Sequence, residues 1–131
     1  MRIQEGPGWR FGLDPGRSPF AVLIGSDHWA AELTLAEARA LRDGAFALHA
    51  ELAALQDRLM PEEAISLELE RGALWLELEA CGDALALRFV LRGEGPVRGL
   101  EGGWGAGATT AVLALLGQLD PGDETARQAQ R

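Results

Sequence analysis

Apolar and polar residues alternate with a period of two through the middle of the chain, from about residue 64 to residue 91. In three successive runs a leucine, isoleucine or phenylalanine takes every second position, with many glutamates between them. This period places one set of side chains on each face of a strand. We therefore predict three antiparallel strands, each with a buried and a solvated face, over residues 65–70, 74–79 and 85–91.

A period of seven precedes these strands and indicates a long helix. Its apolar residues form two interleaved series, namely Leu41, Leu48 and Leu55, and Ala45, Leu52 and Leu59. Thr34 and Glu37 match a capping box at its start, and Pro61 ends it. A helix over residues 35–60 would be about 39 Å long, about twice the length of a typical strand. Part of this leucine seam should overhang its sheet, so the second half of the chain or a second copy must cover it.

Shorter apolar runs, separated by glycine and proline, lie on either side of these segments. Residues 9–13, 20–24 and 29–33 are predicted as strands before the helix, residues 97–104 as a weaker strand, and residues 109–119 as a second helix. The predicted fold class is α+β, with two pseudo-repeated units of antiparallel sheet plus helix (ββββα type). The units span residues 1–60 and 61–119 of one domain, followed by a polar, disordered tail over 120–131.

Charge and composition narrow the classes of function. The 131 residues carry a formal net charge of -8, and all 12 basic residues are arginine. This field repels phosphate backbones and anionic membranes. The amino terminus lacks the apolar core of a signal peptide, and no apolar run approaches the ~20 residues that span a bilayer. With a single cysteine, Cys81, the chain is expected in the reducing cytoplasm, away from membranes.

No motif for catalysis, a cofactor or a metal stands out. His28 lies beside Ser26 and Asp27, residues too close in sequence to align a nucleophile, base and orienting acid. His49 has no second ligand at zinc spacing. The predicted hairpin carries four glutamates that could chelate a cation or act as paired acids, namely Glu68, Glu70, Glu77 and Glu79. The favoured alternative is a solvated face whose charge is balanced across strands by Arg71, Arg88 and Arg92. Glycines at 102–107 are interpreted as flexible turn residues. We therefore expect no enzyme and no cofactor.

Tryptophans with nearby arginines are the most distinctive candidates for binding. Such residues dominate protein interfaces and stack on unpaired bases, but they also cap the edges of cores. All three roles stay open. The candidate binding residues are Trp9, Arg10, Trp29, Arg98, Glu101 and Trp104.

Several motifs taken together resemble one family. They are QEGPGWR at residues 4–10, WAAELT at 29–34, LELE at 67–70, LWLELE at 74–79, LRFVL at 87–91 and RGLEG at 98–102. In combination they resemble an uncharacterised cyanobacterial family, domain of unknown function 1818. The resemblance implies a fold similar to single-stranded-DNA-binding transcriptional regulators such as the plant Whirly proteins, with two sheet-plus-helix units about a pseudo-twofold. The Lys-Gly-Lys-Ala-Ala-Leu motif of Whirly proteins has no counterpart here.

Two functions of different classes follow. We expect a non-catalytic protein-interaction or regulatory module with a protein partner, which also self-associates as a homodimer. The alternative, implied by the resemblance, is a single-stranded nucleic-acid-binding transcriptional regulator. The placement of the arginines distinguishes them, because one patch with Trp9 and Trp29 would favour nucleic acid and dispersal among carboxylates would favour a protein.

Overall fold

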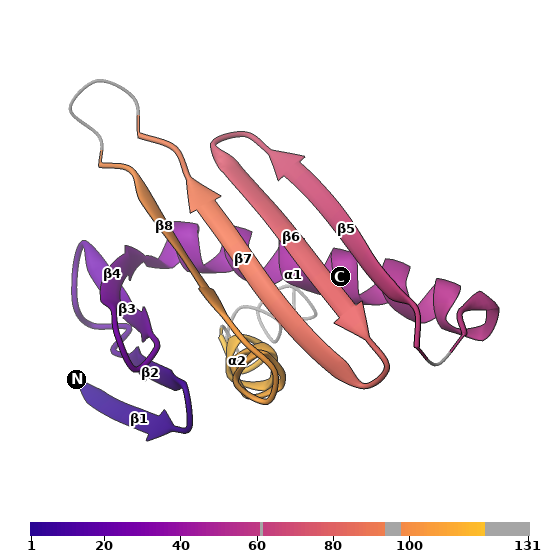
Figure 1. The fold of residues 1–131 in the computed structure, drawn as a ribbon. Helices are drawn as coiled ribbons and strands as arrows, with labels where there is room; N and C mark the ends of the chain where they lie inside the picture. Colours follow the sequence, from indigo (N-terminus) through magenta and orange to yellow (C-terminus); the bar gives the residue numbers. More distant parts are fainter. Residues whose placement is uncertain (61, 94–97, 120–131) are drawn as a thin grey trace, which may run out of the picture.

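The computed structural model describes residues 1–60, 62–93 and 98–119, which form two four-stranded antiparallel sheets and two α-helices (Figure 1). Sheet 1 contains β1 (Arg2–Gly6), β2 (Trp9–Leu13), β3 (Phe20–Gly25) and β4 (Ala30–Thr34). Sheet 2 contains β5 (Ala64–Arg71), β6 (Leu74–Cys81), β7 (Ala84–Leu91) and β8 (Leu100–Trp104). In both sheets the strands lie side by side in chain order. The predicted tail at 120–131 and residue 97 of the predicted strand lie outside the described residues.

Strand β1 is the fourth strand that the ββββα type predicts for the first unit, but the pattern of apolar residues did not locate it. It pairs with β2 from Arg2 opposite Leu13 to Gly6 opposite Trp9. Residues 2–5 are all exposed, so neither face of β1 carries the apolar alternation by which a half-buried strand is recognised. Gly6 allows the Trp9 indole to lie over it, because a Cβ at residue 6 would come within 2.4 Å of that ring.

Helix α1 (Leu35–Leu55) begins where the capping box predicts. The Glu37 N–H donates to Thr34 Oγ1 at 3.1 Å, and the Thr34 N–H donates to Glu37 Oε1 at 2.8 Å. The helix ends five residues before the predicted limit, and a 3-10 turn, η1 (Gln56–Arg58), follows it. Leu55 and Leu59 are only half-buried, so packing does not extend the regular helix through them.

Sheet 2 covers the leucine seam of α1 within the same chain. Figure 1 shows α1 running behind this sheet, with its carboxyl-terminal end beyond β5. The helix packs closely against sheet 2 at Gly44, where a Cβ would lie 2.3 Å from Leu76 Cδ1 of β6. The buried residues of the seam are Ala38, Leu41, Ala45, Leu48 and Leu52. The second half of the chain therefore covers the seam as far as Leu52, whereas Leu55 and Leu59 are half-buried.

Helix α2 (Ala108–Leu116) completes the core between the two sheets. It packs against β2 of sheet 1, β7 of sheet 2 and α1. Val112 and Leu116 are fully buried on this helix. The Thr109 hydroxyl donates to the Trp104 carbonyl at 2.9 Å and accepts the Leu87 N–H at 3.2 Å, which satisfies the buried hydroxyl. Helix α2 thus holds β7 and β8 in place below the exposed face of sheet 2.

Candidate functional site

Two of the candidate binding residues meet in an aromatic cluster between the sheets. Trp29, Phe89 and Trp104 have ring centroids 5.4 to 5.9 Å apart. Trp104 is 4% exposed, and its indole N–H donates to the Gly25 carbonyl at 2.8 Å. Trp29 is half-buried and covers Gly102 of β8. The structure therefore places these tryptophans where they join sheet 1 to sheet 2.

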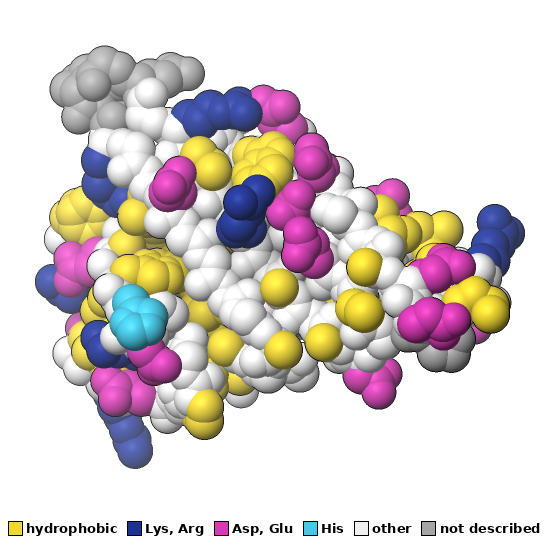
Figure 2. Space-filling model, viewed as in Figure 1, with side chains coloured by type: hydrophobic (Ala, Val, Ile, Leu, Met, Phe, Trp, Pro, Cys, Tyr) yellow, Lys and Arg dark blue, Asp and Glu magenta, His cyan; other side chains and the backbone are white. Residues whose placement is uncertain are grey.

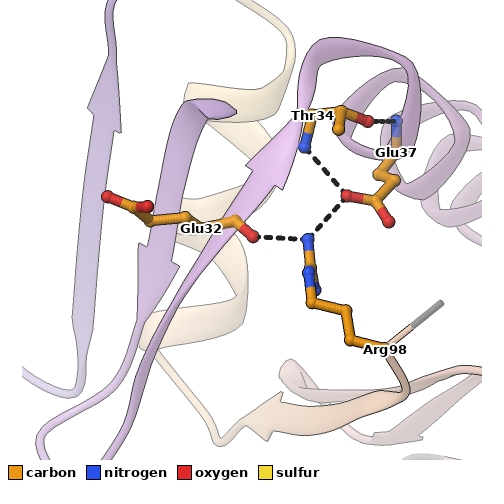
Figure 3. Close-up of polar contacts among 4 residues, drawn as sticks. All are labelled: Glu32, Thr34, Glu37 and Arg98. Atoms are coloured by element: carbon orange, nitrogen blue, oxygen red, sulfur yellow. Dashed lines mark hydrogen bonds and ion pairs between the residues drawn. The ribbon is translucent and has the colours of Figure 1, made fainter. Parts of the chain in front are cut away.

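Arg98 forms a second link between the halves of the chain (Figure 3). Its Nη2 atom donates to the Glu32 carbonyl oxygen at 2.6 Å and to Glu37 Oε1 at 2.8 Å. The guanidinium also lies over the Phe20 ring, 5.1 Å from its centroid. Because Glu37 Oε1 also accepts the Thr34 N–H, one carboxylate both caps α1 and holds Arg98 against sheet 1.

The other three candidates lie on different elements. Trp9 lies on β2, with its ring over Gly6. The neighbouring Arg10 is 3.8 Å from Glu5 across the hairpin, and its side chain is half-exposed. Glu101 is exposed on β8. The structure brings Trp29 and Trp104 into direct contact, while Trp9 and Arg10 belong to the β1–β2 hairpin.

Glu101 lines a depression on the outer face of sheet 2, the face opposite α1. The depression measures about 730 Å³ and extends over β6, β7 and β8. Figure 2 shows it as a pale strip of backbone beside charged side chains. Trp75, Glu77, Glu79, Arg88 and Glu101 contribute its large side chains, and Ala86, Gly102, Gly103 and Gly105 its small residues. We call this surface the sheet 2 depression.

Glycine in β8 makes the depression possible, and this corrects the expectation that residues 102–107 are all turn residues. Gly102 and Gly103 belong to β8. Gly103 lies opposite Arg88 in the register and therefore on the outer face. A Cβ at residue 103 would come within 2.8 Å of the Leu87 carbonyl oxygen. The two consecutive glycines that follow a strand-like run could have indicated the sheet 2 depression from the sequence. Glycine is also frequent in turns, so the pair was interpreted as a turn.

Hydrogen bonds and ion pairs hold several of the charged side chains around the depression. Glu77 Oε2 accepts the Ser66 hydroxyl at 3.1 Å, and Glu77 Oε1 pairs with Arg88 at 3.3 Å. The Arg88 guanidinium lies 5.2 Å from the centroid of the Trp75 ring. The carboxylates of Glu79 and Glu101 also line the surface, so carboxylates outnumber guanidinium groups along it. The depression is consequently acidic, and the Trp75 ring lies on its surface.

Arginines are dispersed among carboxylates throughout the described chain. The ion pairs include Arg10 with Glu5, Arg17 with Glu32, Arg42 with Asp43, Arg88 with Glu77, Arg92 with Glu70, and Arg98 with Glu37. These pairs lie on β2, the β2–β3 turn, α1, sheet 2 and the β7–β8 connection. They do not form the single basic patch with Trp9 and Trp29 that would favour nucleic acid. Two of these pairs, those of Arg88 and Arg92, balance the glutamates of sheet 2 as expected.

Ser26, from the group of Ser26, Asp27 and His28, serves local structure. The Ser26 hydroxyl accepts the backbone N–H of His28 at 3.2 Å, so it caps its own turn. Among the residues that the structure describes, no three histidine, cysteine, aspartate or glutamate side chains are grouped to hold a metal ion. No helix in the same residues is long and apolar enough to cross a membrane.

Comparisons with known proteins agree with this architecture. One similar structure is the crystal structure, at 1.80 Å resolution, of a protein with unknown function from the DUF155 family of Prochlorococcus sp. NATL2A. It has a TM-score of 0.81 and 34% sequence identity, and the match covers 88% of this chain and 96% of that one. No curated protein matches this chain. Residues 4–119 match the family described as Domain of unknown function (DUF1818), so the chain belongs to the DUF1818 family.

Proposed function

We propose that this protein is a non-catalytic interaction module that binds a segment of a protein partner in the sheet 2 depression. The observation that carries the proposal is the charge arrangement, with arginines paired singly to carboxylates and an acidic, glycine-floored surface on sheet 2. Protein partners can match such a mixed surface by complementary side chains. A phosphate backbone would instead require a continuous run of cations.

The depression also suggests the chemistry of the partner segment. Glu79 and Glu101 have no ion pair among the described residues and can accept hydrogen bonds from arginine or lysine. Trp75 offers a ring on which a partner arginine can lie in place of Arg88, whose guanidinium lies 5.2 Å from its centroid. Gly103 and Gly105 remove side chains that would keep a partner backbone away. An extended segment rich in arginine fits these three features.

A peptide titration followed by NMR tests the location. We expect a short arginine-rich peptide to shift the amide signals of Gly102, Gly103 and Gly105 and the Trp75 indole signal, while an acidic peptide of equal length leaves them in place. Reversing the two unpaired charges with Glu79→Arg/Glu101→Arg should weaken binding about tenfold or more.

The matched control is Glu51→Arg/Asp57→Arg, which reverses two exposed charges on α1 and η1 and changes the net charge equally. It should bind as the parent protein does. Equal weakening by both double variants would show only a general charge effect, and the proposed location would then be wrong. Shifts confined to the β1–β2 hairpin would place the surface at Trp9 and Arg10 instead.

The second candidate is a single-stranded nucleic-acid-binding regulator. Its support is the element order, since each half is a four-stranded antiparallel meander followed by a helix. That order is what the resemblance to Whirly-like regulators implies, and we propose that a pseudo-twofold relates the halves. The dispersed arginines weigh against this function, so we rank it below the interaction module.

A further inference from the structure

Strand β5 forms a long edge of sheet 2. Its eight residues pair continuously with β6, from Ala64 opposite Cys81 to Arg71 opposite Leu74. In the described chain it has no other strand neighbour. Natural edge strands are usually kept from pairing by charged side chains, proline, a bulge or short length. Strand β5 contains no proline, and its pairing shows no register shift. Its charged side chains, Glu68, Glu70 and Arg71, are therefore what a partner strand must accommodate.

The other sheet edges are blocked or shorter. Strands β1 and β8 have five residues each. On β4, the Glu32 carbonyl already accepts a hydrogen bond from Arg98. Within the described residues, β5 is therefore the edge that offers the longest uninterrupted row of backbone donors and acceptors.

Apolar surface along this edge is incompletely covered. Ile65, Leu67 and Leu69 of β5 face α1 but are only half-buried, whereas the leucines of β6 on the same face are at most 5% exposed. The end of α1 extends past β5 in Figure 1. Beyond that end, Met60 is 58% exposed. A neighbouring sheet placed against β5 would cover these side chains.

We propose that a second copy of this chain pairs its β5 antiparallel to β5 about a twofold axis at Leu67. Strands in one sheet keep their buried faces aligned, so residues of the same face must lie opposite each other. With the axis at Leu67, Ile65 faces Leu69 of the second copy and Leu67 faces its equivalent. On the outer face, Ser66 lies opposite Glu68 and Ala64 opposite Glu70.

Charge selects this register over its neighbours. An axis at Glu68 would place that glutamate opposite its own copy, and an axis at Ser66 would place Glu62 opposite Glu70. Like charges directly opposite each other destabilise a strand pair. The axis at Leu67 instead brings Arg71 opposite Glu63 of the second copy, the residue immediately before β5, twice in the dimer. Both residues are exposed, and neither has an ion-pair partner among the described residues.

The resulting dimer has one continuous sheet of eight strands. Because the twofold axis is perpendicular to the sheet, both outer faces lie on the same side, and the two sheet 2 depressions are presented together. The projecting end of α1 lies on the side occupied by the second copy. This assembly is independent of what the depression binds.

Sedimentation velocity over a range of concentrations tests the interface through a charge swap. The parent protein should sediment as a dimer. Arg71→Glu places two acidic pairs across the interface and Glu63→Arg places two basic pairs, so each should raise the dimer Kd about tenfold. Combining them as Glu63→Arg/Arg71→Glu recreates opposite charges in reversed order and should restore the parent Kd. Circular dichroism spectra should remain unchanged in all variants, since both side chains are exposed. The urea midpoint should also be unchanged when it is measured at a concentration at which the parent protein is monomeric, because dimerisation itself raises it.

Three outcomes would overturn the proposal. One is a parent protein that stays monomeric up to about 0.5 mM, because the dimer affinity would then be too weak for a specific interface. Another is a dimer whose Kd neither single variant changes, which would place the contact on a different surface. The third is failure of the double variant to restore dimerisation, because the Leu67 register alone sets residue 71 opposite residue 63.

Discussion

At the residue scale, close packing of glycine and tryptophan connects the two sheets. A Cβ at residue 102 would lie 2.7 Å from Trp29 Cζ2 and 2.8 Å from Cη2. Trp29 is held in turn by Phe89 and Trp104, so its ring has little freedom to move away. The Trp29 ring therefore requires a glycine at residue 102. No neighbouring side chain requires a glycine at residue 105.

Gly102→Ala should lower the free energy of unfolding by about 1–3 kcal/mol, because it overpacks this contact. The control is Gly105→Ala, where a Cβ would meet no heavy atom within 4 Å. Its effect should remain within about 0.5 kcal/mol. Urea denaturation followed by tryptophan fluorescence measures both values. Equal stabilities for the two variants would contradict the packing assigned to Trp29.

At the element scale, α1 is held by burial of its seam under sheet 2. Leu48 is 1% exposed and lies at the centre of the seam, while Leu55 is half-buried at its end. Burial of leucine contributes roughly in proportion to the apolar area removed from water. The stability of the helix should therefore fall along its length toward η1.

Leu48→Ala should destabilise the protein by about 2–5 kcal/mol by leaving a cavity. Leu55→Ala is the matched comparison and should cost clearly less, since the site is open to solvent on one side. Thermal and urea unfolding of both variants gives the two values. If the midpoints for Leu48→Ala equal those of the parent protein, the seam does not pack as described.

Most of these elements could be predicted because their patterns are local. Period-two alternation located β5, β6 and β7 to within one or two residues, and the capping box at Thr34 located the start of α1. The position of β1 could not be predicted, since hydrogen bonding to β2 holds this strand without an apolar face. The end of α1 depended on where sheet 2 stops covering it.

The candidate site was less predictable because it is assembled from distant segments. Glu101 was a candidate, but Trp75 and Arg88 join it only when β6, β7 and β8 lie side by side. Arg98 was also a candidate, and its partner Glu37 is 61 positions away along the chain. No sequence pattern reports such contacts. The roles of the other candidate residues in binding remain predictions.

At the scale of the whole molecule, the charge distribution separates the two proposed functions. The chain has a formal net charge of -8, and its ion pairs spread arginines over both sheets and α1. A single-stranded nucleic acid needs a basic groove beside stacking aromatic rings. Here Trp104 is buried and Trp29 packs against it, so these rings are committed to joining the two halves.

The most direct test compares two labelled probes by fluorescence anisotropy under the same salt conditions. One is a mixed-sequence single-stranded oligonucleotide, and the other is an arginine-rich peptide. We predict saturable peptide binding that Glu79→Arg/Glu101→Arg weakens, and no oligonucleotide binding tighter than ~10 μM at physiological salt. Submicromolar oligonucleotide affinity that falls steeply with salt and is abolished by Trp9→Ala or Arg10→Ala, with no saturable peptide binding, would contradict the interaction module and favour the nucleic-acid-binding regulator.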